Sequence, residues 1–234
     1  MDWKIIDEKN MKTMKLEYTY FSEIGTRKNN EDYLRVLTIP EYDKTLFIVC
    51  DGMGGHSYGE VASETVCKSI ATYWENNPDL GDSEQKIYNA AIQACNMLDK
   101  ESFGYDMGTT MVLASIENDR VMVAHCGDSR CYVVDVKGNV KYRTVDHADD
   151  LGYITNCFFT GRDDMAVPDI KFIQLEPCDR ILLCTDGLYN AIDDEILLHT
   201  LHCARDVGQV EEKYKMICHD EASDNYTAII IEVE

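Results

Sequence analysis

Four aspartates stand beside apolar runs that are long enough to form buried strands, and their side chains could share one chemistry. They are Asp51, Asp128, Asp186 and Asp224. A single Asp-Gly pair is an ordinary turn, so one such aspartate would mean little. An unpaired buried carboxylate is costly, however, and four at strand ends predict a shared carboxylate site in which a bound cation balances the charge.

The donor type limits the metal that such a site would hold. Carboxylate oxygens are hard ligands, which select Mg²⁺ or Mn²⁺. Two such ions close together can share a hydroxide and clamp the oxygens of an in-line displacement at phosphorus. A phosphate substrate would also need a cation, and the guanidinium of Arg27 is the candidate, although one arginine by itself is an ordinary surface residue.

Histidine and cysteine chemistry is less well supported. His199 and His202 are spaced for one helix face, but no third ligand accompanies them, so we expect surface or packing roles. Cys50 and Cys184 precede two of the aspartates, yet neither begins the Cys-x5-Arg loop of a cysteine phosphatase. We expect both thiols to pack in the core.

Composition excludes several classes of partner. The 234 residues carry a formal net charge of −21, which argues against nucleic acid or an anionic membrane. No apolar segment is long enough to span a bilayer, and the N-terminal residues lack a signal-peptide core. Ten cysteines without a Cys-x-x-Cys pair indicate free thiols in a reducing cytoplasm. Nothing indicates an obligate dimer, and we expect a monomer.

Apolar periodicity predicts strands and helices in blocks. Strands are expected at residues 16–22, 33–39, 46–50, 109–116, 120–126, 131–136, 140–144, 170–175, 180–185 and 226–233, the run at 46–50 being buried on both faces. Helices are expected at residues 59–76, from Asp82 as N-cap to 101, at 193–203 and at 207–219. We expect one antiparallel meander over residues 109–144 and a hairpin around residues 176–179. This order favours an α+β fold.

Seven polar motifs follow one another along the chain. They are Arg27 with Asn30-Glu31-Asp32, Asp51-Gly52-Met53-Gly54-Gly55-His56, Gly108-Thr109-Thr110, Gly127-Asp128-Ser129-Arg130, Asp146-His147, Asp186-Gly187 and Asp224-Asn225-Tyr226-Thr227. None is specific alone, but the ordered set is highly specific. It resembles the metal-dependent protein serine/threonine phosphatases of type 2C, particularly the compact bacterial members, and the resemblance covers nearly the whole chain.

The resemblance implies a fold and a domain organisation. The fold would be a four-layer αββα sandwich, with two central antiparallel β-sheets and a helix pair on each outer face. Residues 16–234 would form a single catalytic domain after an N-terminal extension at residues 1–15. The metal ions would lie at one end of the cleft between the sheets.

The resemblance also implies the metal ligands. Asp51 would bridge two Mn²⁺ or Mg²⁺ ions, and the carbonyl of Gly52 would ligate the second. Asp186 and Asp224 would complete the shell of the first. Asp128 would join Asp186 in binding a third, weaker ion.

The remaining matches concern the substrate and the attacking water. Glu31 would orient metal-bound waters, with Asp32 supporting the site from nearby, and Arg27 would hold the phosphate. His56 would either donate a proton to the leaving alkoxide, contact the substrate or serve only the structure. Met53 stands where other branches of the family carry a general-acid histidine, so a metal-bound water is an alternative proton donor.

The sequence departs from the family pattern after Asp146-His147. Relatives carry a long excursion there, the flap, before a segment similar to residues 156–161. Only residues 148–155 intervene in this chain, so the flap, at about residues 148–160, is expected to be short. The cleft would then be open.

The first functional interpretation is hydrolysis of phosphoserine and phosphothreonine in proteins by a metal-held hydroxide, without a phosphoenzyme. The family also implies a partner Ser/Thr kinase. One alternative is a non-catalytic domain that binds a phosphoprotein or a kinase. Another is a phosphatase for a small phosphorylated metabolite, which an open cleft would admit.

Overall fold

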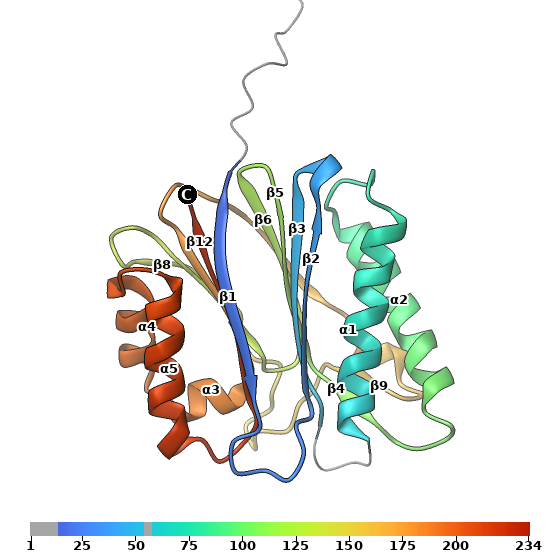
Figure 1. Cartoon of the computed structure of the whole chain (residues 1–234). Coiled ribbons are helices and arrows are strands. Elements are labelled where there is room, and N and C mark those ends of the chain that lie inside the picture. The colour runs from blue at the N-terminus through green and yellow to red at the C-terminus, as the bar shows by residue number, and fades with distance from the viewer. Residues whose placement is uncertain (1–13, 54–57) are drawn as a thin grey trace, which may run out of the picture.

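The computed structural model describes residues 14–53 and 58–234, and two five-stranded antiparallel sheets form its centre (Figure 1). Sheet A has the strand order β1-β12-β11-β7-β8, and sheet B has the order β10-β6-β5-β3-β2. Sheet A consists of β1 (Leu16–Glu23), β12 (Tyr226–Val233), β11 (Arg180–Cys184), β7 (Arg130–Val134) and β8 (Val140–Arg143). Sheet B consists of β10 (Asp169–Gln174), β6 (Arg120–Cys126), β5 (Met111–Glu117), β3 (Lys44–Asp51) and β2 (Asp32–Ile39).

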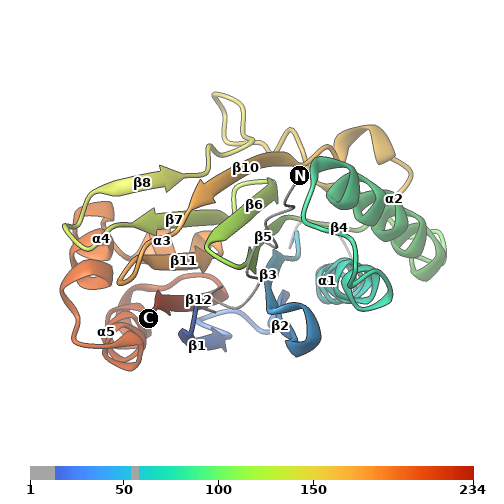
Figure 2. The ribbon, with the colours of Figure 1, turned by 90° about the horizontal axis from the view of Figure 1, so that it is seen from above.

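Helices cover the outer face of each sheet, as the view from above shows (Figure 2). Sheet B carries α1 (Gly59–Asn76) and α2 (Glu84–Glu101), while sheet A carries α4 (Asp194–Cys203) and α5 (Val207–Glu221). The short helix α3 (Asp186–Ala191) and the small ladder of β4 (Gly108–Thr109) with β9 (Phe158–Phe159) were not predicted from periodicity. Two 3-10 turns cover Pro40–Tyr42 and Asp163–Met165. The predicted four-layer αββα sandwich is confirmed.

Three hydrophobic clusters correspond to the three contacts between these layers. In β3, Leu46, Ile48 and Cys50 pack beneath α1 and α2. Phe47 and Val49 alternate with them and pack between the two sheets. A third cluster fills the space between sheet A and its helices. The continuous apolar run is therefore buried on both faces, because one parity of residues contacts helices and the other contacts the opposite sheet.

The predicted pairing of several strands was wrong. β6 and β7 are consecutive in the sequence but belong to different sheets, so residues 109–144 do not form one meander. β10 and β11 do not pair either: β10 pairs with β6, whereas β11 lies between β7 and β12. Periodicity identifies a strand and its buried parity, but it does not say which sheet edge the strand joins. Both errors fall where the chain crosses between the sheets.

The N-cap of α2 is Ser83 and not Asp82. The Ser83 hydroxyl accepts a hydrogen bond from the Lys86 N–H at 3.2 Å. The buried carboxylate of Asp82 instead lies 3.6 Å from the ammonium groups of both Lys44 and Lys86. The capping-box pattern therefore identified the helix but assigned its cap one residue early, because the acidic side chain serves as a counter-ion.

Two further expectations concern the thiols and the start of the chain. All ten cysteines are free, and Cys50 and Cys184 are buried in the core as predicted. Residues 1–13 of the predicted extension lie outside the described residues. Within the described part, no helix combines the length and the apolar character that crossing a membrane requires.

We predict that Asp82→Asn destabilises the protein more than Ser83→Ala does. Asparagine caps a helix as well as aspartate does, so only the loss of the buried counter-charge matters. We expect a loss of about 3 kcal/mol for Asp82→Asn, against about 1 kcal/mol for the lost cap in Ser83→Ala. Urea denaturation measures both values, and a smaller loss for Asp82→Asn would show that its charge is not an important counter-ion for Lys44 and Lys86.

Candidate metal centre

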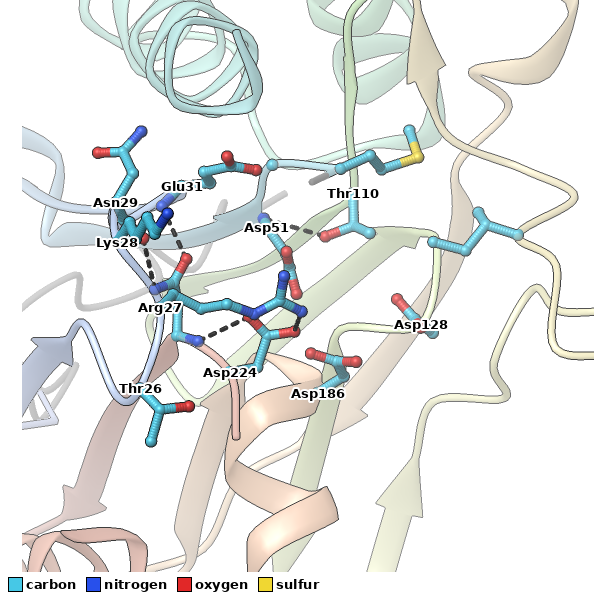
Figure 3. A pocket seen from close by; sticks show the side chains of 14 residues that line it. Thr26, Arg27, Lys28, Asn29, Glu31, Asp51, Thr110, Asp128, Asp186 and Asp224 are labelled. Carbon is cyan, nitrogen blue, oxygen red and sulfur yellow. Dashed lines mark hydrogen bonds and ion pairs between the residues drawn. The ribbon is translucent and has the colours of Figure 1, made fainter. Parts of the chain in front are cut away.

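One end of the sandwich gathers the predicted carboxylates around a single cavity of about 510 Å³. Asp51 ends β3, Asp128 follows β6 by one glycine, Asp186 begins α3 after β11, and Asp224 precedes β12. Both sheets therefore contribute two aspartates each. Figure 3 shows the four carboxylates facing a common space. The prediction that distant strand ends bring these aspartates together is confirmed.

The backbone around Asp51 and Gly52 is tightly fixed. The Asp51 N–H donates to Thr110 Oγ1 at 3.1 Å, and the Gly52 N–H donates to the Glu31 carbonyl at 3.0 Å. A Cβ at Gly52 would lie only 2.3 Å from the carbonyl oxygen of Gly59. Only glycine allows this close approach of three backbone segments. Gly52 lines the cavity. The family resemblance predicts that its carbonyl is a metal ligand.

Crowding makes these carboxylates hard to ionise together. Burial, followed by the charges of Asp32 and Asp186, raises the pKa of Asp51 far above its usual range. Burial and then Asp186 raise the pKa of Asp128 to about 6. The pKa of Asp186 is raised by burial and by Asp224, and a hydrogen bond with Asp51 opposes this shift. Such mutual repulsion is the environment that a bound cation relieves.

Asp32 lies behind this cluster and does not line the cavity. It is 8% exposed, it pairs with Asp51 across β2 and β3, and its Oδ2 accepts from Thr185 Oγ1 at 2.9 Å. Burial raises its pKa to about 7, against the hydrogen bonds from Thr227 and Thr185. This position agrees with a supporting role, because Asp32 links β2 to β11 beneath the cavity.

Arg27 and Glu31 reach the cavity from the loop between β1 and β2. The guanidinium of Arg27 lies beside Asp224, with Nη2 2.6 Å from Oδ2 (Figure 3). Glu31 is held by its backbone, because its N–H donates to Asn225 Oδ1 at 2.9 Å and its carbonyl accepts from Ser63 Oγ. Burial and then Glu60 raise the pKa of the Glu31 side chain.

The donor set fits hard divalent ions. All side-chain donors from the four aspartates are carboxylate oxygens, and the cavity lining described includes neither histidine nor cysteine. Oxygen-only sites suit Mg²⁺ and Mn²⁺ and not Zn²⁺. His199 is exposed on α4 and His202 is half-buried there, in agreement with the predicted surface or packing roles. His56 lies outside the described residues, so its role stays a prediction.

Sequence reasoning gave no role to several residues that hold this centre together. The Asn225 side-chain amide donates to the carbonyls of Ile24 and Asn29, both at 2.8 Å, which fixes the loop that carries Arg27. Thr110 Oγ1 lies 2.7 Å from Ser129 Oγ while it also accepts from Asp51. Asn225, Thr110 and Ser129 lie inside the sequence motifs, which indicated that they matter. The groups that they bind, however, depend on the fold.

The short segment after His147 also reaches the cavity. The Thr155 N–H donates to the His147 carbonyl at 2.8 Å, and Ala148 forms an isolated bridge with Ile154. Ile154 lines the cavity, whereas the side chains of Leu151 and Tyr153 are exposed at 81% and 68%. The sequence predicted a short segment here but not that its second half contacts the cavity.

Comparison with known families agrees with this arrangement. The family profile of protein phosphatase 2C matches residues 22–216. The chain belongs to the protein phosphatase 2C family. The match includes Arg27, Glu31, Asp51, Asp128 and Asp186, while Asp224 lies just beyond it.

Relatives of the chain are bacterial phosphatases of this family. It is 28% identical over 243 residues to the serine/threonine protein phosphatase PstP of Mycobacterium tuberculosis, covering 94% of this chain but only 46% of PstP. The chain thus spans about half the length of that relative. It is 25% identical to the serine/threonine phosphatase stp of Listeria welshimeri, covering 88% of this chain and 91% of stp.

Solved structures share the fold. The catalytic domain of PstP in complex with two manganese ions superposes with a TM-score of 0.77 at 28% identity, covering 94% of this chain and 99% of that one. The serine/threonine phosphatase Stp1 from Staphylococcus aureus gives a TM-score of 0.82 at 26% identity, covering 94% and 96%. The αββα architecture of the family is therefore shared over nearly the whole chain.

We predict that Asp128→Asn stabilises the metal-free protein by more at pH 7.5 than at pH 4.5. The pKa of Asp128 is raised in the folded state, so this group favours folding below its unfolded pKa and ceases to do so as the pH rises through about 6. The side-chain amide in Asp128→Asn does not ionise, so the variant does not lose this contribution to stability as the pH rises. Thermal unfolding in EDTA at the two pH values measures it, with exposed Asp150→Asn as the control. If the difference in stability between Asp128→Asn and the wild type were the same at both pH values, the electrostatic explanation would be contradicted.

Proposed function

We propose that this chain hydrolyses phosphoserine and phosphothreonine monoesters in proteins with the help of two Mn²⁺ or Mg²⁺ ions. The observation that carries the proposal is the convergence of Asp51, Asp186 and Asp224 with the Arg27 guanidinium on one cavity. Family membership and the two-manganese structure of a relative support it. The resident ions would supply a water acidic enough to attack phosphorus at neutral pH and positive charge to neutralise the phosphate oxygens.

The residues of the chain have separate tasks in this proposal. Asp51 would serve both ions, the carbonyl of Gly52 would hold one of them, and Asp186 and Asp224 would hold the other. Asp51 and Gly52 lie in backbone that is fixed by hydrogen bonds to Thr110 and Glu31, so their oxygen donors are oriented before an ion arrives. The raised pKa values of Asp51 and Asp186 would fall when a cation binds, because its positive charge offsets the repulsion between neighbouring carboxylates.

Arg27 orients the substrate. A guanidinium matches two oxygens of a phosphate group with two N–H donors, and Arg27 stands at the cavity mouth with half of its side chain exposed. Glu31 orients metal-bound waters, and Asp32 supports Asp51 from the neighbouring strand. The proton for the leaving alkoxide comes from His56 or from a water.

The finer features belong to the same proposal. Asp128 and Asp186 bind a third, weaker ion. The short flap leaves the cavity open, so that a phosphorylated loop or terminus of a partner protein can enter. The substrates are phosphoproteins, with a Ser/Thr kinase as the opposing enzyme, and the chain acts as a cytoplasmic monomer with one catalytic domain over residues 16–234.

We predict that Asp51→Asn reduces Mn²⁺-dependent hydrolysis by more than about 100-fold, because a neutral amide cannot bridge two cations. Arg27→Lys should raise the KM for a phosphopeptide and lower kcat/KM on the order of 100-fold, because an ammonium group lacks the bidentate fork. Steady-state kinetics with phosphoserine and phosphothreonine peptides measures both. EDTA should abolish activity, and excess Mn²⁺ should restore it.

The same assay distinguishes the alternatives. Mn²⁺ binding without hydrolysis of any phosphoester would identify a non-catalytic domain. A higher kcat/KM for nucleotides or sugar phosphates than for phosphopeptides would identify a small-molecule phosphatase. Unchanged activity in Asp51→Asn would refute the metal centre itself.

A further inference from the structure

His147 joins three segments beside the metal centre, although the proposed function assigns it no role. Its backbone N–H donates to the Gly127 carbonyl at 3.0 Å, and its carbonyl accepts from the Thr155 N–H. Its side chain returns to the same turn, since Nδ1 accepts from the Gly127 N–H at 3.2 Å. His147 therefore contacts both polar groups of the Gly127 backbone, one residue before Asp128.

A set of potential metal ligands surrounds this histidine. One atom each from His125, His147 and Asp169 lies within 4.8 Å of the others. The two imidazole rings are stacked, however, with centroids 4.4 Å apart and planes inclined by only 8°. A metal ion binds in the plane of an imidazole, and no position lies in the planes of two stacked rings. The arrangement instead suits hydrogen bonding through His147, from Gly127 on one side to Asp169 on the other.

The partners of His147 fix its tautomer. A backbone N–H only donates, so Nδ1 carries the lone pair and the proton of the neutral ring is on Nε2. Nε2 lies 3.2 Å from Asp169 Oδ2 and donates to it. His125 packs against this ring from below, and its Nε2 is held by the Val145 carbonyl at 2.9 Å. Asp169 thereby holds His147 in the form that can accept from Gly127.

Gly127 determines where the Asp128 side chain points. Its φ of +105° belongs to the left-handed region, and a Cβ there would lie 2.6 Å from the Thr110 side chain. The chain passes from sheet B to sheet A at this turn, between β6 and β7. A small rotation at Gly127 therefore moves the Asp128 carboxylate relative to Asp186 and Asp51.

The far side of Asp128 is held independently. The Tyr189 hydroxyl donates to the Asp128 carbonyl at 3.1 Å, and the Arg130 guanidinium lies 3.5 Å from the centroid of the Tyr189 ring. Asp146 binds that guanidinium through two hydrogen bonds of 2.9 and 2.6 Å. Adjacent residues thus hold the two sides of the turn: Asp146 acts through Arg130, and His147 acts through Gly127.

We propose that His147 is the positioning residue that sets the Asp128 carboxylate for the weaker metal site, with Asp169 fixing the orientation and tautomer of its ring. The proposal rests on the assignment of Asp128 to that site in the proposed function. Neither His147 nor Asp169 touches the substrate or the reacting atoms. Their effect is on the affinity of the weaker ion and not on the ligands of the two tighter ones.

Two substitutions of His147 separate its two hydrogen bonds. In His147→Asn, the side-chain oxygen stands where Nδ1 was and still accepts from Gly127. In His147→Gln, the amide nitrogen reaches the place of Nε2 and still donates to Asp169, but the acceptor for Gly127 is lost. We expect His147→Gln to weaken Mn²⁺ binding at the weaker site by about three- to tenfold, the range for one hydrogen bond, and His147→Asn by less than about twofold.

A second pair of variants tests the exposed partner. Asp169→Asn keeps an oxygen that accepts from Nε2, so we expect nearly wild-type binding at the weaker site. Asp169→Leu removes the acceptor for Nε2, so His147 can also adopt the tautomer that is protonated at Nδ1. We expect this variant, like His147→Gln, to bind Mn²⁺ more weakly at the weaker site. Because the Asp169 side chain is exposed, neither change threatens the fold. His219→Gln on the exposed face of α5 is the control for a histidine-to-glutamine change elsewhere.

Electron paramagnetic resonance of free Mn²⁺ gives the number and affinity of the binding sites without any assay of activity. Amide hydrogen exchange at Gly127 in the Mg²⁺-loaded protein reports the hydrogen bond directly, and protection should fall in His147→Gln but not in His147→Asn. Equal effects of the two variants would show that His147 only packs against His125 and would overturn the proposal. So would unchanged affinity in all four variants.

The outcome also separates this proposal from the function on which it rests. If wild-type protein binds Mn²⁺ in tight and weaker classes but hydrolyses no phosphoester, the proposed function fails and the comparison of variants stands. If Asp128→Asn leaves the weaker class intact, the assignment of Asp128 fails, and the positioning proposal fails with it.

Discussion

Repulsion among carboxylates at the junction of the two sheets is the constraint on which the rest of this structure depends. Burial and neighbouring negative charge raise the pKa values of Asp51, Asp186 and Asp128 together. No arrangement of protein groups alone resolves such a conflict cheaply, and only Arg27 places a cation in contact with one of the metal-centre carboxylates among the described ion pairs. The fold therefore maintains a strained set of charges whose natural complement is a pair of divalent ions.

The sandwich produces this crowding through its connections. Segments that cross from one sheet to the other must pass the end of the cleft between them, and the turn with Asp128 does so. The apolar layers supply the rigidity, because β3 is packed on both faces and cannot yield to the repulsion at its end. The packed core of this chain thus holds the crowded carboxylates in place.

The sequence was sufficient for the layers and for the convergence of the four aspartates on one cavity. Long apolar runs identify strands, and an aspartate at the end of each run is visible without coordinates. Strand partners were not predictable, since β10 and β11 have the periodicity of a hairpin but join different sheets. The cap at Ser83 and the hydrogen bonds of Asn225, Thr110 and His147 were missed for a related reason. A polar side chain satisfies whichever backbone group the tertiary fold brings to it, and spacing alone does not reveal that group.

The ion pair between Arg27 and Asp224 joins residues that are 197 positions apart. Asp224 precedes β12, which itself lies between β1 and β11 in sheet A. During synthesis, a ribosome-bound chain that has not yet released β12 lacks both a central strand and one carboxylate of the centre. The cluster of carboxylates is therefore complete only when these long-range contacts have formed. A cleaved product without this segment would lack both the strand between β1 and β11 and one carboxylate of the cavity.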